Sequence, residues 1–313
     1  MPKCSRVHRF GGLCKNLHIQ AASLHPKRTF ASLASDLGVS ETFVRSIFLD
    51  HVAERERAYV IETPSYLGVD EIVLGAPRFV AADLQHRRLI DLLEKRTLET
   101  VKAWFARLSR PEAIQILVMD MWQPYKIATI EQLPHAKIVI DRFHVVRRFH
   151  EVTEPIRQAI RASLPLDQRR QLKHDYKLLF KRERDLSESE LLILESWTGR
   201  CPLLHSLFRL KEEFHDLYEA ADEQEAWDRY LAFLGHIPPA LQEAFIPLQL
   251  TIEEWGEYIF NYWSVPRRLT NGFVEAKNRC IRDANRAGYG LSLRTLRAKM
   301  LFSSNPPAPS PDH

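Results

Sequence analysis

Residues 114–120 read IQILVMD, a continuous apolar run that ends in an aspartate. Such a run is typical of a β-strand that is buried on both faces of a sheet. Three shorter β-type runs precede it, SYLGVDEIV (65–73), RFVAADL (78–84) and RLIDLL (88–93), and turn residues separate them. These runs predict a meander of three strands followed by a buried strand.

The segments around the buried strand complete an α/β pattern. Residues 97–108 place apolar side chains at helical spacing, and a second helix is expected over 124–132. Residues 137–140 form another short apolar run, which ends in Asp141. The order is three strands, helix, strand, helix, strand. We therefore predict a ribonuclease-H-like mixed sheet, a fold whose catalytic carboxylates lie on the first and fourth strands.

The rest of the chain reads as helical. No strand pattern occurs between Arg142 and Glu257, and the segment is too long for a structureless loop. We predict a catalytic core over 61–145, a large all-helical insertion over 146–260 and the final core helices over 261–303, with helices at 266–284 and 293–300. The tail, 304–313, has the composition of a disordered end.

The N-terminal part suggests DNA binding. Residues 1–28 are basic and poorly defined, and residues 29–60 contain two short helical patterns around Gly38, with Ser40 placed to cap the second. This spacing predicts a helix-turn-helix in which Thr42 and Arg45 face the major groove. A plain helical hairpin is the alternative.

Composition and charge indicate a soluble protein with a polyanionic partner. The 313 residues are 45% hydrophobic and 27% charged, with a net charge of +4, and no apolar stretch is long enough to cross a membrane. The four cysteines form no Cys-x-x-Cys pair. Basic residues concentrate in the first thirty residues, in 142–184 and in 267–299, which suits a phosphate backbone, although solvated helix faces would give similar runs. We expect a cytoplasmic, nucleoid-associated protein.

Acidic residues at strand ends are candidates for chemistry on phosphodiesters. Asp70 lies within the first strand and Asp120 at the end of the fourth, and Glu275 lies on a later helix. Carboxylates are the ligands that Mg²⁺ and Mn²⁺ prefer, and a pair of such ions catalyses phosphoryl transfer. A single aspartate at a strand end is more often a turn or helix cap. Glu71 and Asp83 are alternative candidates for the first catalytic acid, and Asp141 is an alternative candidate for the second.

Four motifs together resemble transposases of bacterial insertion sequences, specifically the ISL3 family of the DDE superfamily. They are LGVDE (67–71), MDMWQPY (119–125), DRFHVV (141–146) and TNGFVEAKNRCIRDANRAGYG (270–290), and the resemblance extends over roughly 66–301. It implies metal-dependent cleavage and strand transfer of DNA. It also implies that two Mg²⁺ or Mn²⁺ ions are held by Asp70, Asp120 and Glu275. The implied partners are the double-stranded element ends and the target, bound by a homo-oligomer.

The resemblance and the helical spacing also point to supporting residues. Asp141 and His144 are implied to support the active site. Asn271 and Asn278 bracket Glu275 on one helix face and are expected to bind its carboxylate or the DNA backbone. Expected DNA contacts are the arginines that follow on that helix and those of the 142–184 run: Arg279, Arg282, Arg286, Arg147 and Arg148.

Two aromatic residues after Asp120 admit two interpretations. Trp122 and Tyr125 could stack on a displaced base or pack in the core, and core packing is the stronger expectation for Trp122.

The sequence departs from the family pattern in two places. Members carry an N-terminal zinc-binding module of paired Cys-x-x-Cys motifs, whereas the first thirty residues here hold only Cys4 and Cys14, so we expect this module and its zinc to be missing. Residue 276 is Ala where the family tends to have Gly. An inactive, truncated remnant that binds DNA, or a DNA-binding regulator on the same fold, therefore remains an alternative.

Overall fold

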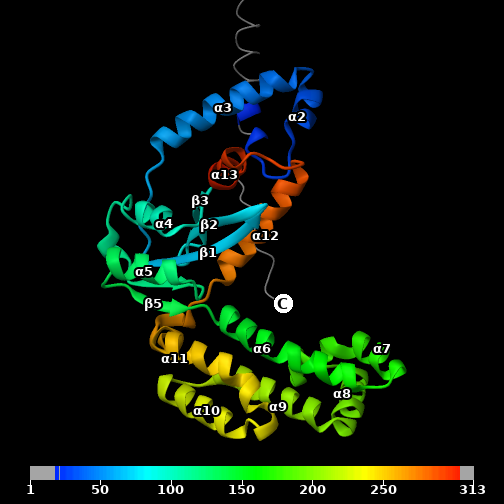
Figure 1. Cartoon of the computed structure of the whole chain (residues 1–313). Coiled ribbons are helices and arrows are strands. Elements are labelled where there is room, and N and C mark those ends of the chain that lie inside the picture. The colour runs from blue at the N-terminus through cyan, green and yellow to red at the C-terminus, as the bar shows by residue number, and fades with distance from the viewer. Residues whose placement is uncertain (1–17, 21, 304–313) are drawn as a thin grey trace, which may run out of the picture. The chain divides into compact units, whose positions relative to one another are not determined.

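The computed structural model describes residues 18–20 and 22–303 (Figure 1). The chain divides into two compact units. The first unit comprises the residues up to Lys137 together with those from Asn271 onward, and the second is Ile138–Thr270. The basic segment 1–17, with Cys4 and Cys14, and the tail after residue 303 lie outside the described residues.

A five-stranded mixed sheet forms the centre of the fold. Its strands are β1 (Tyr66–Leu74), β2 (Ala76–Asp83), β3 (Arg88–Leu93), β4 (Ile116–Met119) and β5 (Lys137–Ile140), in the order β3-β2-β1-β4-β5. Strands β1, β2 and β3 form an antiparallel meander, and β4 joins β1 in parallel. The predicted order of elements and the ribonuclease-H-like α/β class are confirmed.

Helices cover both faces of the sheet. On one face, Phe79 of β2 packs against Trp104 of α4 (Leu98–Phe105) and Tyr125 of α5 (Gln123–Gln132). On the other, the adjacent Val80 shares a core with α12 (Gly272–Ala287) and α13 (Leu293–Phe302). Successive strand residues point to opposite faces, so both faces of β2 are buried. Figure 1 shows α12 running beside β1 and β2.

One predicted helix begins later than expected. The pattern predicted a helix over 266–284, but residues Pro266–Arg268 form only a short 3-10 turn and α12 begins at Gly272. Arg267 and Arg268 have positive φ angles of 61° and 47°, which a right-handed helix cannot contain. The predicted helix is therefore wrong over its first six residues.

The two helices predicted around Gly38 are present. They are α2 (Phe30–Leu37) and α3 (Glu41–Ala58), separated by Gly38 with φ 64°. The side chain of Ser40 accepts the backbone N–H of Phe43 and so caps α3. Thr42 and Arg45 are exposed, and Arg45 pairs with Glu41 one turn away.

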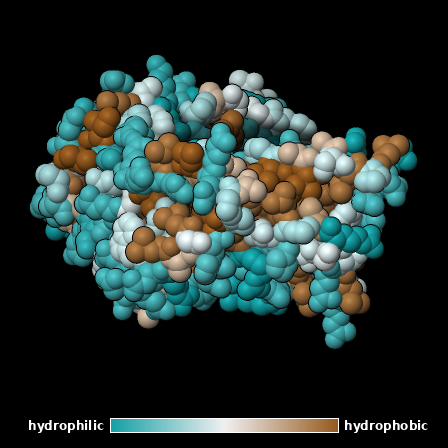
Figure 2. Space-filling view, turned by 60° about the horizontal axis from the view of Figure 1, so that its bottom comes forward, coloured by the Kyte–Doolittle hydropathy of each residue, from teal (hydrophilic) through white to brown (hydrophobic). Residues whose placement is uncertain are grey.

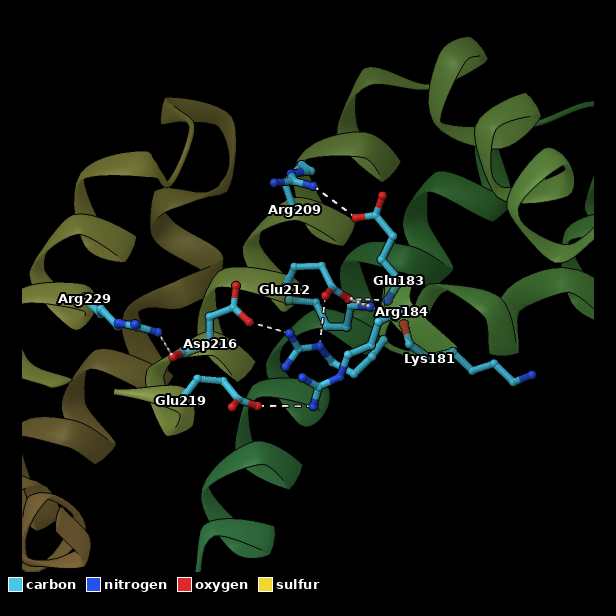
Figure 3. A network of polar contacts seen from close by, with 10 residues as sticks. Lys181, Glu183, Arg184, Arg209, Glu212, Asp216, Glu219 and Arg229 are labelled. Atoms are coloured by element: carbon cyan, nitrogen blue, oxygen red, sulfur yellow. Dashed lines mark hydrogen bonds and ion pairs between the residues drawn. The ribbon is translucent and has the colours of Figure 1, made fainter. Parts of the chain in front are cut away.

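The second unit is helical from residue 142 to residue 264, which confirms the predicted helical character of this region. Its helices are α6 (Arg142–Ser163), α7 (Leu166–Asp175), α8 (Glu188–Arg200), α9 (Pro202–Asp216), α10 (Glu223–His236) and α11 (Gln242–Ser264). Arg182 is held by Glu212 and Asp216 of α9, within a network that also pairs Arg184 with Glu219 (Figure 3).

Some apolar side chains of this unit face solvent. Leu192, Leu231 and Leu250 are each more than half exposed. Figure 2 shows hydrophobic surface interspersed with hydrophilic residues on the face that it presents.

Across the described residues, no helix combines the length and the apolar character needed to cross a bilayer.

Candidate functional site

Asp70 and Asp120 are carried by two neighbouring strands, since β1 and β4 pair in parallel. The last residues paired between them are Gly68 and Val118, and each acid follows its own strand's last paired residue by two positions. Neighbouring strands lie about 4.8 Å apart. Both aspartates are buried, with exposed fractions of 5% and 9%. The two acids predicted from the sequence therefore both lie just beyond the segment in which β1 and β4 pair.

Helix α12, which carries Glu275, packs closely on β1 because residue 68 is glycine. A Cβ atom at Gly68 would lie 2.7 Å from Asn271 Oδ1 and 2.9 Å from Val274 Cγ2, both on this helix or at its start. Real Cβ atoms do not approach other atoms so closely. Gly68 thus allows the first turn of α12 to lie against the strand that holds Asp70.

Two asparagines hold α12 in this position. Asn271 Nδ2 donates to the carbonyl of Val69 at 2.8 Å, and Asn278 Nδ2 donates to Asp70 Oδ2 at 2.9 Å and to the carbonyl of Glu71 at 3.1 Å. Both side chains are buried. The two residues that bracket Glu275 therefore bind β1 and the first acid. The predicted contacts of these asparagines with the Glu275 carboxylate or the DNA backbone stay a prediction.

Glu275 lies between these asparagines in sequence and shares their side of the helix. Its side chain is half-buried. Burial raises the pKa of Glu275, while the charges of Arg279 and Arg282 act in the opposite direction. Helix α12 therefore directs a half-buried carboxylate toward β1, next to a cationic stripe on the same helix.

The sequence interpretation missed a fourth charged residue, Arg96, in the loop after β3. Its Nη2 lies 2.7 Å from Asp120 Oδ2, and its Nη1 pairs with Glu71. Its guanidinium lies over the rings of Trp122, at 3.9 Å, and Tyr125, at 4.9 Å. Burial alone would lower the pKa of Arg96, but Asp120, Tyr125 and Glu71 outweigh it and raise that pKa. The second acid is therefore held by a resident cation.

Tyr125 connects Arg96 to the first acid. Arg96 Nε donates to the Tyr125 hydroxyl at 3.3 Å, and that hydroxyl donates to the carbonyl of Asp70 at 3.0 Å. Tyr125 is fully buried, and burial raises its pKa. Stacking of Tyr125 on a displaced base is therefore wrong, because its ring belongs to the core. Trp122 is partly buried and packs edge-on against Tyr125.

The two alternative candidates for the first catalytic acid have other contacts. Asp83 is fully buried and accepts the backbone N–H groups of Gln85 and His86, so it stabilises the β2–β3 turn. Glu71 is paired with Arg96. Asp70 is thus the acid of β1 that contacts α12.

The carboxylates do not form a ready metal-binding cluster. Within residues 18–20 and 22–303, no three His, Cys, Asp or Glu side chains are grouped so that they could hold a metal ion. Carboxylates such as those of Asp70, Asp120 and Glu275 are suitable ligands for hard divalent cations. In this structure, however, the three side chains are not grouped as metal ligands, and Asp120 forms an ion pair with Arg96.

The remaining predicted residues lie elsewhere. Asp141 and His144, at the start of α6, belong to the second unit; Asp141 is buried and His144 partly buried. Arg147 and Arg148 both pair with Glu151 at 3.1 Å. On α12, Arg279 and Arg286 are exposed, Arg282 is partly buried, and Arg286 lies 3.7 Å from Asp283.

Comparison with known proteins gives a family for this arrangement. A family model described as transposase, of the DDE type and the ISL3 group, matches residues 67–300, which is most of the chain. The chain belongs to the ISL3 family of DDE transposases. It is also 25% identical over 237 residues to the transposase for insertion sequence element IS1001 of Bordetella parapertussis.

The match to the Bordetella transposase covers 72% of this chain and 57% of that protein. The residues matched by the ISL3 model run from the start of β1 into α13, and so include Asp70, Asp120, Arg96 and Glu275. Arg96 could have been suspected from the sequence, since it is a lone arginine before a helix in a region that supplies two acids. Its partners depend on the fold and could not be read from spacing.

Proposed function

We propose that this ISL3-family chain cleaves DNA at the ends of an insertion sequence and joins the freed 3′-hydroxyls to target DNA. The observation that supports it best is the set of contacts around the two aspartates. Asn278 of the helix that carries Glu275 binds Asp70, and Tyr125 links the Asp70 carbonyl to Arg96, which binds Asp120.

In this proposal Asp70, Asp120 and Glu275 are the ligands of two Mg²⁺ or Mn²⁺ ions. Bound ions would supply activation of an attacking hydroxyl or water and stabilisation of the leaving oxygen. Asn278 would orient the carboxylate of Asp70, and Arg96 would compete with a cation for Asp120 Oδ2. Asp141 and His144 are proposed to support the active site.

Six arginines and one threonine on three helices are proposed to bind DNA. They are Arg279, Arg282 and Arg286 on α12, Arg147 and Arg148 on α6, and Arg45 and Thr42 on α3. Each neutralised phosphate releases counterions, so binding should weaken steeply with salt. Double-stranded element ends and target DNA are the proposed partners in the nucleoid, and a homo-oligomer would hold paired ends.

Strand transfer from pre-cut DNA ends with Mn²⁺ tests the proposal without requiring end cleavage. Asp120→Asn should lower the rate by about 100-fold or more, because it removes a charged ligand without changing side-chain size. Asp167→Asn makes the same chemical change at an exposed position of α7 and should leave the rate unchanged. Equal rates in Asp120→Asn and the parent would refute the catalytic assignment.

A second candidate function is supported by the ion pair between Arg96 and Asp120. A chain in which this pair is permanent would bind DNA without cutting it, as a remnant or regulator. This second function predicts that DNA binding depends on salt but not on Mn²⁺. It also predicts that the parent chain gives no joined product when DNA binding is saturated.

A further inference from the structure

The loop between α12 and α13 holds one aromatic side chain in solvent. Tyr289 is 92% exposed, and its φ angle is 55°, in the left-handed region. This backbone conformation is unfavourable for a residue with a Cβ atom, and glycine adopts it freely. A ring that is almost fully exposed stabilises the folded chain little, so the fold gives no reason for tyrosine here.

The loop is nevertheless firmly built. Gly290 N–H donates to the carbonyl of Asn285 at 2.9 Å, and Leu291 N–H donates to the Asn285 side chain at 2.9 Å. Leu291 packs on the core shared by the sheet, α12 and α13. A Cβ at residue 288 would lie 2.4 Å from Leu291 Cγ, so Gly288 is needed for this packing. Tyr289 is therefore presented by an ordered turn.

The position of this turn relates it to the proposed site. It follows α12 directly, and the helix rises about 1.5 Å per residue, so its end at Ala287 lies about 18 Å from Glu275. Tyr289 is thus too far from the acids to take part in chemistry, and Arg279, Arg282 and Arg286 lie on the helix between them.

An exposed aromatic ring beyond a cationic stripe suits single-stranded nucleic acid. Arginines attract the phosphates, and an aromatic face stacks on an unpaired base of any identity. A tyrosine also loses little side-chain entropy on binding, since it has two χ angles. We infer that Tyr289 is a DNA-binding residue that stacks on an unpaired base beyond the arginines of α12. The inference rests on the proposed function, because it requires DNA along α12.

The test compares binding of a 30-base-pair duplex with the same duplex carrying a gap of six unpaired nucleotides, measured by fluorescence anisotropy over a range of salt. The parent chain should prefer the gapped DNA by roughly 5- to 100-fold, the range that one base stack supplies. Tyr289→Phe should retain this preference and Tyr289→Gly should lose it. The salt slope should not change in either variant, because no phosphate contact is removed.

Two further measurements separate stacking from a structural role. Tyr289→Gly relieves the left-handed strain, so its melting temperature should be no lower than that of the parent; a residue needed for folding would give a lower one. Arg286→Ala should reduce the salt slope by about one and keep the preference for gapped DNA. A parent chain without the preference, or a Tyr289→Gly variant that keeps it, overturns the inference. A parent chain that binds neither DNA overturns the proposed function instead.

Discussion

At the scale of single residues, the acids of the site are controlled by neighbours that are not acids. Asn278 binds Asp70, and Arg96 binds both Asp120 and Glu71. The Arg96 side chain is only 10% exposed and lies against Trp122 and Tyr125. A guanidinium in this position neutralises carboxylates that would otherwise repel one another at close range. It also occupies an oxygen that a metal ion would need.

Replacing Arg96 should therefore strengthen metal binding. In Arg96→Gln, the loss of a charge-assisted competing interaction of about 1.5 kcal/mol should tighten Mn²⁺ binding by about 10-fold, measured by electron paramagnetic resonance titration. Arg96→Lys keeps the charge but cannot bridge two carboxylates with a planar fork, so its affinity should lie between those of the parent and Arg96→Gln. Weaker Mn²⁺ binding in Arg96→Gln would mean that Arg96 supports the ligands and does not compete.

At the scale of elements, the site depends on how α12 docks on the sheet. The contact is close because Gly68 has no side chain, and Asn271 and Asn278 replace side-chain packing with hydrogen bonds to β1. Buried Ile72, Val274 and Ile281 complete the interface. A small displacement of this helix would break the contact of Asn278 with Asp70.

Gly68→Ala tests this docking. The new Cβ would meet Asn271, Leu84 and Val274 at 2.7 to 2.9 Å, so α12 must shift. We expect the free energy of unfolding to fall by about 2 kcal/mol, as for overpacked cores, and strand transfer to fall more than DNA binding does. Gly199→Ala in α8 is the control, because its Cβ would meet nothing within 4 Å; alanine there should leave stability equal or higher. Unchanged stability and activity in Gly68→Ala would contradict the proposed docking.

At the scale of the whole molecule, the two units are stabilised by different means. The first has a sheet covered on both faces, whereas the second combines aromatic packing with buried charge. His215 of α9 is surrounded by Arg182, Lys211, His150 and Glu212. Burial first, and then the nearby positive charges, lower the pKa of His215 to about 4.

This shift predicts acid sensitivity of the second unit. Between pH 6.5 and pH 4 the unfolded chain binds a proton at His215 that the folded chain does not, so stability is complete above pH 6.5 and is lost as the pH falls through this window. After allowance for partial exposure, the loss should be about 2 kcal/mol. Amide hydrogen exchange of α9 in the full chain at pH 7 and pH 4.5 measures it. His215→Gln should flatten the dependence, and identical pH profiles would disprove the role of His215.

The order of strands and helices, and the acids near the sheet, could be predicted from the sequence because they depend on local patterns. Apolar runs and helical periodicity set the elements, and Asp70, Asp120 and Glu275 stand at recognisable points of those elements. The start of α12 could not be predicted, since the positive φ angles of Arg267 and Arg268 leave no mark on hydrophobic periodicity.

Only the tertiary structure decided which side chains bind which acids. Chain segments far apart in sequence bring Asn278 to Asp70 and Arg96 to Asp120, and Tyr125 connects Arg96 to the carbonyl of Asp70. It also decided that Tyr125 is buried and Tyr289 exposed, although both are tyrosines within family motifs. The physical reason is that periodicity describes interactions within one element, whereas ion pairs, hydrogen bonds and burial depend on distances between elements that only folding sets.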